Sequence, residues 1–186
     1  CIIGIDISVN AIKVAHKKGL NVIVGSAEYL PFRNHVFDYI TALEIIEHIT
    51  DTDTFLDEIY RTLKVKGCCI ITLPNLAAWY ERIALLLGYQ PSSLEVSLRY
   101  MVGTIAYNPI RDKPAGHVRG FTLRAILELL RMHRFKILRV TSASKPLKLS
   151  VWWSTIFNMI NSILSKIPSL SGYVIIKAEK QEETIY

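Results

Sequence analysis

Phe37-Asp38-Tyr39-Ile40-Thr41-Ala42-Leu43, followed by Glu44-Ile45-Ile46-Glu47-His48-Ile49, is an apolar run that leads directly into acids and an imidazole. The first part is short, β-branched and aromatic, which is typical of a strand covered on both faces of a parallel sheet. Ligands of open α/β sheets bind off the carboxyl ends of such strands. We therefore expect a central strand over residues 37–43 and a functional site where it ends.

The segment after Leu43 places three polar groups at helical spacing. If it is helical, Glu44, Glu47 and His48 share a face, because residues three and four apart are neighbours on a helix. Carboxylates suit Mg²⁺ or Mn²⁺, and imidazole adds affinity for transition metals. Acids are also favoured at the first turn of any helix, and His48 could simply cap or pack there. The spacing alone leaves both interpretations open.

Length and composition bound the class of protein. The 186 residues fit a single domain, with 51% hydrophobic residues, a net charge of +6 and a pI near 9.2. The basic residues are scattered without an interleaved aromatic stripe, which argues against nucleic acid as a partner. No run of about 18 uncharged apolar residues is present. Three cysteines form no disulfide framework, so we expect a cytoplasmic protein, with peripheral membrane contact at most.

Strands and helices alternate along the chain, which predicts an α/β fold with a mostly parallel sheet. Strands are predicted at residues 1–5, 21–25, 68–73, 135–140 and 173–177, in addition to the strand at 37–43. Helices are predicted at residues 8–18, 52–63, 76–87, 123–133 and 151–167. The irregular stretch at about residues 88–115 is interpreted as a substrate-side insertion.

Two early segments carry candidate nucleotide-binding groups. Asp6 follows a strand, where a carboxylate can accept hydrogen bonds from both hydroxyls of a ribose, although an ordinary helix-start acid looks the same. The loop Ser26–Phe32 is stiffened by Pro31 and can hold a flat ring. The backbone of Ala27 and the side chains of Ser26 and Glu28 are candidates for contact with an adenine edge.

Two later segments are candidates for the acceptor side. His117 and Arg119 lie between glycines just before a helix, where they suit either the surface or contact with a ligand. Residues 151–167 place apolar side chains at helical spacing opposite serine and asparagine. We expect this helix to cover the sheet with its apolar face, while a lid or a membrane-surface helix remains the alternative.

The order of several motifs resembles the class I S-adenosylmethionine-dependent methyltransferases, from their second strand to their last. The motifs are Gly4–Ser8, Ser26–Phe32, Phe37-Asp38, Glu44–His48, Leu63-Lys64 and Thr72–Asn75. The resemblance implies a Rossmann-like fold with helices on both faces and an antiparallel last strand. It implies that S-adenosylmethionine is the cofactor, and it assigns Asp6 to the ribose, Ile7 to the adenine face, Ser26 and Ala27 to the adenine edge, and Leu43 to the methionine part.

The chain departs from the family's pattern at two points of the implied cofactor site. Ser26 stands where the family usually has an acid, and the family's first strand and glycine-rich loop would precede Cys1. We therefore expect a single partial methyltransferase domain over residues 1–186, whose sheet lacks its centre and which, on its own, binds the cofactor poorly and is inactive.

The run of acids and imidazole is similar to ubiquinone-pathway O-methyltransferases and RNA-end 2′-O-methyltransferases, some of which use such groups to bind a metal. By that resemblance Glu44, Glu47, His48 and His117 would hold Mg²⁺ or Mn²⁺. Without a metal, Glu47, His48 or His117 would be the general base. The predicted activity is O-methylation of a small-molecule or lipid-like acceptor. The rivals are a nicotinamide-dependent oxidoreductase and a degenerate binding module without catalysis.

Overall fold

The computed structural model describes residues 1–105, 113–144 and 154–182. Its elements, in chain order, are β1 (Gly4–Asp6), α1 (Val9–Lys17), β2 (Val22–Val24), β3 (Phe37–Leu43), η1 (Ile46–His48), α2 (Thr52–Thr62), β4 (Leu63–Pro74), α3 (Trp79–Leu86), α4 (Leu123–Met132), β5 (Phe135–Ala143), α5 (Ser154–Leu164) and β6 (Tyr173–Lys180). Strands and helices alternate as predicted. The α/β fold class is therefore confirmed.

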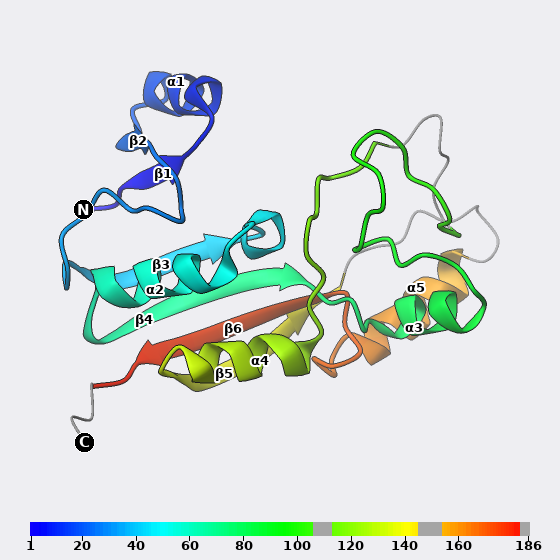
Figure 1. Cartoon of the computed structure of the whole chain (residues 1–186). Helices are drawn as coiled ribbons and strands as arrows, with labels where there is room; N and C mark the ends of the chain where they lie inside the picture. The colour runs from blue at the N-terminus through cyan, green and yellow to red at the C-terminus, as the bar shows by residue number, and fades with distance from the viewer. Residues whose placement is uncertain (106–112, 145–153, 183–186) are drawn as a thin grey trace.

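The strands form two separate sheets (Figure 1). In the smaller sheet, β1 pairs with β2 in parallel, and α1 packs on this pair. In the larger sheet the strand order is β3-β4-β6-β5. β3 and β4 are parallel, whereas β6 is antiparallel to both of its neighbours. The predicted antiparallel last strand is thus present.

The helices begin where short polar side chains can satisfy the first free backbone amides. Ser8 accepts from the amide of Ala11 at 3.2 Å at the start of α1. Asp51 accepts from the amide of Thr54 at 3.0 Å before α2. Thr122 serves α4 in the same way. These three N-caps lie within one residue of the predicted helix starts.

The hydrophobic core lies between one face of the larger sheet and the helices α2 and α4, which cover that face in Figure 1. The strands contribute apolar side chains at alternate positions, among them Ile71, Leu73, Val174 and Ile176. The helices contribute residues at helical spacing, among them Phe55, Leu56, Ile59, Ile126 and Leu130. Burial of these side chains is the main favourable term that joins the elements.

The position of β3 corrects one prediction. The strand spans residues 37–43 as expected, but it is an edge strand of its sheet, not a central one. Among the described strands only β4 pairs with β3, and Tyr39 and Leu43 are 66% and 53% exposed because they share the face of the strand opposite buried Ala42, which is left uncovered. An apolar run shows that a strand can be buried on both faces, but it does not show that both faces are covered.

The orientation of α5 corrects a second prediction. Its inward side is mixed: Asn161 is 2% exposed and its side-chain oxygen accepts from the Trp79 indole at 3.1 Å, while the Phe157 ring packs on Trp79. Ser165 is also buried, whereas Met159 and Ile163 are each 60% exposed. The apolar face was predicted to cover the sheet, whereas Ile156, Met159 and Ile163 are exposed. The start of the predicted helix, with Trp152 and Trp153, lies outside the described residues.

Within the described ranges, none of the helices has both the length and the apolar character needed to cross a bilayer.

Candidate functional site

The chain turns sharply where β3 ends. Glu44 has a φ of 53°, in the left-handed region, and only Ile46–His48 form a short 3-10 helix. Because the segment is not a regular α-helix, the Glu44 carboxylate does not join the cluster of Glu47 and His48. Its carboxylate instead accepts a hydrogen bond from the Thr72 hydroxyl of β4 at 2.8 Å. The predicted convergence of all three groups is therefore only partly right.

Glu47 is the most unusual residue of this turn. It is 2% exposed, and neither of its carboxylate oxygens has a hydrogen-bond partner among the described residues. Burial raises the pKa of this carboxyl above its ordinary value, and the nearby charge of Glu44 adds to the shift. A buried carboxylate without donors is unfavourable unless it is protonated or meets a positive charge.

Two imidazoles lie beside this carboxylate. The rings of His48 and His117 have centroids 5.0 Å apart. One ligand atom from each of Glu47, His48 and His117 can be chosen so that all three lie within 4.8 Å of one another. Nδ1 of His48 lies 3.0 Å from the carbonyl oxygen of Gly116. Because a carbonyl only accepts, this bond places the proton on Nδ1 and leaves the Nε2 lone pair available.

The loop that carries His117 is attached to the turn by its backbone. The amides of Val118 and Arg119 both donate to the Glu47 carbonyl, at 2.9 and 3.1 Å. The guanidinium of Arg119 donates to the carbonyls of Ile49 and Thr50. Arg119, a candidate for ligand contact in the sequence, therefore has a structural role in holding this loop against the end of β3.

Glu95 fixes the same loop from the other side. Its carboxylate accepts three backbone hydrogen bonds, from Ala115 at 2.6 Å, Gly116 at 2.7 Å and His117 at 3.1 Å. Sequence reasoning missed Glu95, because it lies in the irregular stretch and 22 residues from His117. The one sequence signal that could have suggested Glu95 is its position in the stretch interpreted as a substrate-side insertion.

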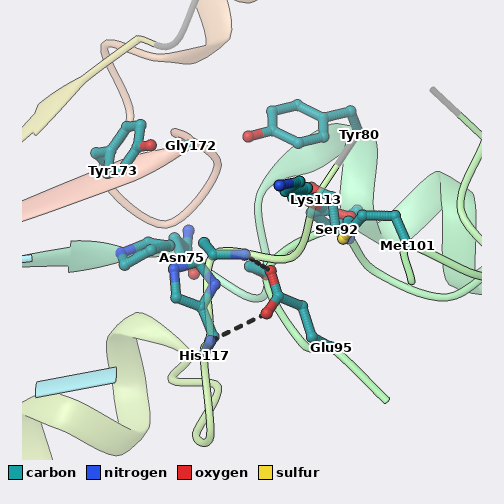
Figure 2. A pocket seen from close by; sticks show the side chains of 13 residues that line it. Asn75, Tyr80, Ser92, Glu95, Met101, Lys113, His117, Gly172 and Tyr173 are labelled. Carbon is teal, nitrogen blue, oxygen red and sulfur yellow. Dashed lines mark hydrogen bonds between the residues drawn. The ribbon is translucent and has the colours of Figure 1, made fainter. Parts of the chain in front are cut away.

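A cavity of about 230 Å³ opens next to His117. Figure 2 shows His117, Asn75 and Tyr173 along one side and Tyr80 and Lys113 along the other. The wall combines the end of β4, the start of β6, α3 and parts of residues 92–101 and 113–117. The irregular stretch thus contributes to a cavity, and His117 belongs to both the cavity and the cluster with Glu47 and His48.

The predicted cofactor residues lie at the carboxyl ends of β1, β2 and β3. Asp6 is exposed, and its Oδ1 accepts from the Ser8 amide at 2.7 Å, which leaves Oδ2 for a ligand. The Asp6 carbonyl accepts from the Gly25 amide at 3.1 Å, so the loop after β2 begins beside it. Ile7 is 76% exposed next to Asp6, and Leu43 is exposed at the end of β3.

The loop after β2 uses part of its polar capacity internally. The Ser26 hydroxyl accepts from the Glu28 amide at 3.2 Å, and Glu28 Oε1 accepts from the Asp51 amide at 2.8 Å. Ala27 packs against the core. The Glu28 side chain therefore anchors the loop to the start of α2, and a ligand would meet the backbone of this loop more readily than its side chains.

Comparison with known proteins gives a family match for the first part of the chain. Residues 1–71 match the family model described as a methyltransferase domain. An uncharacterized protein of Methanocaldococcus jannaschii is 36% identical over 69 residues, which are 37% of this chain and 34% of the relative. A demethylmenaquinone methyltransferase of Listeria welshimeri is 33% identical over 88 residues, which are 42% of this chain and 37% of the relative. The matches span little more than a third of the length of these relatives.

Comparison of structures covers nearly the whole chain. An S-adenosylmethionine-dependent methyltransferase of Thermotoga maritima, described as a possible histamine N-methyltransferase, superposes with a TM-score of 0.64 at 20% identity. The match covers 96% of this chain and 72% of that one. At such low identity the likeness concerns the fold. Residues 1–71 thus match a methyltransferase domain, and the chain shares the fold of solved S-adenosylmethionine-dependent methyltransferases.

Proposed function

We propose that this chain is part of an enzyme that transfers a methyl group from S-adenosylmethionine to an oxygen atom of a small or lipid-like acceptor. The observation that carries the proposal is the convergence of Glu47, His48 and His117 beside a cavity of about 230 Å³. The similarity to a demethylmenaquinone methyltransferase supports an acceptor with an apolar part. The cavity is the proposed acceptor site.

The cofactor would lie at the carboxyl ends of β1, β2 and β3. The residues present fit this assignment, because Asp6 keeps a carboxylate oxygen for the ribose and exposed Ile7 can flank the adenine. The backbone of Ser26 and Ala27 would meet the adenine edge, and Leu43 the methionine part. Glu28 contributes mainly by fixing the loop, since one of its oxygens is bound to Asp51.

The chain's own residues would prepare the acceptor. S-adenosylmethionine, when bound, supplies a methyl group made electrophilic by its sulfonium. An acceptor hydroxyl attacks better as it loses its proton, and a positioned base is worth about 10²–10⁴-fold in rate. His48 can take this proton on Nε2, because its Nδ1 is held by Gly116. His117, in the wall of the cavity, is the other candidate base.

The same three side chains fit a divalent cation. Glu47 offers buried carboxylate oxygens without donors among the described residues, and a cation would offset the cost of their burial. Glu47, His48 and His117 would be the ligands, whereas Glu44 is engaged with Thr72. Mg²⁺ or Mn²⁺ bound there would lower the pKa of an acceptor hydroxyl.

Methyl transfer by the full-length protein tests the proposal. Labelled S-adenosylmethionine is offered with hydroxylated aromatic and lipid-like acceptors, with and without excess chelator. If a cation is used, chelation abolishes transfer, Mg²⁺ or Mn²⁺ restores it, and the affinity for S-adenosylhomocysteine stays the same. If an imidazole is the base, transfer survives the chelator and falls about 10²–10⁴-fold in His48→Ala or His117→Ala.

Glu44→Ala is the matched control, because Glu44 lies in the same turn but outside the cluster. It should keep most of the activity. Failure of the full-length protein to bind S-adenosylhomocysteine would contradict the proposal and favour a binding module without catalysis.

A further inference from the structure

Glu58 and Arg61 of α2 form a charged pair with two hydrogen bonds. They lie three residues apart on the helix, and Arg61 donates from Nε to Glu58 Oε1 at 2.6 Å and from Nη2 to Oε2 at 2.8 Å. Two such bonds hold the guanidinium in one orientation. The bond from Arg61 keeps the pKa of the Glu58 carboxyl below its ordinary value, so both groups are charged at neutral pH.

The pair, here called the loop clamp, reaches from α2 to the loop after β2. Arg61 Nη2 donates to the Leu30 carbonyl at 3.0 Å, and Nη1 donates to the Phe32 carbonyl at 2.8 Å. Nη1 also donates to the side-chain oxygen of Asn34 at 2.7 Å. Glu58 Oε2 accepts from the Leu30 amide at 2.7 Å. With the two bonds to Glu58, the contacts of Arg61 match the five N–H donors of a guanidinium.

A second helix pair shows how the loop clamp differs from an ordinary surface pair. Arg124 donates to Glu128 at 2.9 Å on α4, and these side chains are 88% and 58% exposed. Exposed pairs of this kind contribute little to stability. The side chains of Arg61 and Glu58 are only 31% and 18% exposed. The loop clamp is thus a tertiary contact that joins two segments far apart in the sequence.

The loop clamp holds the residues that follow the proposed adenine contact. The turn Ser26–Tyr29 is closed by the Tyr29 amide, which donates to the Ser26 carbonyl at 3.2 Å, and Leu30 comes directly after it. Glu28, inside the turn, accepts from the Asp51 amide at 2.8 Å, just before α2. The turn is therefore attached to α2 from its middle and, through the loop clamp, from its exit.

This attachment matters because the strands do not provide one. β1 and β2 form a sheet of their own, and among the described strands no ladder joins it to β3 (Figure 1). A loop that is ordered before binding lowers the entropic cost of taking up a ligand. We propose that Arg61 and Glu58 are positioning residues for the cofactor, which keep the turn Ser26–Tyr29 in the shape that receives the adenine. This role rests on the proposed function, whereas the hold on the loop does not.

Hydrogen exchange in the full-length protein without cofactor tests the hold on the loop. Arg61→Ala removes the side-chain donor of the Leu30 and Phe32 carbonyls and the partner of Glu58. We expect the Leu30 amide to exchange about tenfold faster or more, because the loop opens more easily, while amides of β4 and β6 keep their rates. Arg124→Ala is the matched control, since it breaks a helix pair that holds no loop, and it should leave the Leu30 amide unchanged.

Cofactor affinity and kinetics test the positioning role. In Arg61→Ala, the Kd of S-adenosylhomocysteine and the KM of S-adenosylmethionine should rise about tenfold, since binding must then also order the loop. The kcat at saturating cofactor should change by less than about twofold, because Glu47, His48 and His117 are not part of the loop clamp. Arg61→Lys should bind with intermediate affinity, because lysine keeps the charge but lacks the planar fork.

Circular dichroism checks that each variant is folded, and if Arg61→Ala is not, Arg61→Lys carries both measurements with smaller expected changes. An unchanged exchange rate at Leu30 would overturn the proposal. Faster exchange with an unchanged Kd, or a fall in kcat with an unchanged KM, would overturn it as well. If the unchanged protein binds no S-adenosylhomocysteine, the proposed function fails and the positioning role fails with it, even where the Leu30 amide responds to Arg61→Ala.

Discussion

At the scale of single residues, the site is organised around the carboxylate of Glu47, which the protein itself buries. Glu47 is held by its backbone, which receives two amides from the His117 loop, while its side chain is enclosed without donors among the described residues. A group in this state is unfavourable for folding and available for a ligand. The residue is therefore better explained by function than by stability.

Glu47→Gln should stabilise the chain at neutral pH in excess chelator. The folded-state pKa of Glu47 is raised, so the folded chain binds more protons than the unfolded chain above about pH 4.5, and the free energy of unfolding falls as pH rises through the raised pKa. Glutamine does not titrate, so the variant lacks this fall in the free energy of unfolding. We expect a gain on the order of 1 kcal/mol at pH 7, or about 2–4 °C in Tm, with little gain at pH 4.

Thermal unfolding at several pH values measures this effect. Glu128→Gln is the control, because Glu128 lies on α4 with 58% of its side chain exposed. Equal pH profiles for Glu47→Gln and the unchanged chain would show that Glu47 carries no raised pKa.

Asp6→Ala in the full-length protein should weaken the binding of S-adenosylhomocysteine. Two charge-assisted hydrogen bonds to the ribose would vanish, each worth about 1.5–3 kcal/mol. Calorimetric titration should therefore show at least about a tenfold rise in Kd. Asp6→Asn can keep the bond to the Ser8 amide while losing the charge, and so separates loss of the ribose contact from loss of the local turn. Unchanged affinity in Asp6→Ala would remove Asp6 from the site.

At the scale of elements, the end of β4 is joined to α3 and β6 by one amide side chain. Asn75 is 1% exposed, its Nδ2 donates to the Ser171 carbonyl at 2.9 Å, and its Oδ1 accepts from the Ala77 amide at 3.0 Å. Its backbone amide donates to the Gly172 carbonyl at 2.9 Å. Asn75 lines the cavity, but its contacts show that it holds the cavity wall together.

Asn75→Ala should destabilise the chain by about 2–4 kcal/mol, because a buried amide and a buried carbonyl lose their partners. Urea unfolding followed by circular dichroism measures the change. Asn158→Ala is the matched control, since Asn158 is exposed on α5, and it should shift stability by less than about 0.5 kcal/mol. If Asn75→Ala lowers the free energy of unfolding as little as the control does, the contacts of Asn75 do not contribute to the stability of the core.

At the scale of the whole molecule, the proposed cofactor residues and the acceptor cavity lie in two parts of the fold that differ in how much of each is buried and paired. β1, β2 and α1 form a unit in which no helix residue is buried, and β1 pairs with β2 alone among the described strands. β4 and β6 lie in the middle of the larger sheet and carry much of the core. We therefore expect the half of the site that would bind nucleotide to be the less stable half.

Hydrogen exchange should show this difference directly. In the 186-residue chain, amides of β1, β2 and α1 are expected to exchange by local opening, while those of β4 and β6 exchange only in global unfolding. The difference in protection should reach about 10²-fold or more. Equal protection of the two sheets, measured by mass spectrometry on peptides covering each strand, would contradict the division into two units.

Local patterns were enough to predict most elements. Ser8, Asp51 and Thr122 mark helix starts, because an N-cap is a local hydrogen bond between near neighbours. The apolar runs of β3 and β4 identify strands, since alternation and β-branching are local properties. The order of motifs predicted the fold class and the methyltransferase-domain match of residues 1–71. The same order predicted Asp6, Leu43 and the loop after β2 at the carboxyl ends of strands; each lies at such an end, but β1 and β2 form a sheet separate from that of β3.

Only the tertiary structure decided how the parts face one another. It kept the Glu44 carboxylate out of the cluster with Glu47, because one left-handed residue replaced a regular helix. It brought Glu95 to the His117 loop across 22 residues of irregular chain, where no periodicity exists to guide prediction. It buried Asn161 of α5 and left Met159 and Ile163 exposed, since the Asn161 side chain is bonded to the Trp79 indole. Amphipathic spacing states that a helix has two sides, but which side is buried depends on partners that only the folded chain supplies.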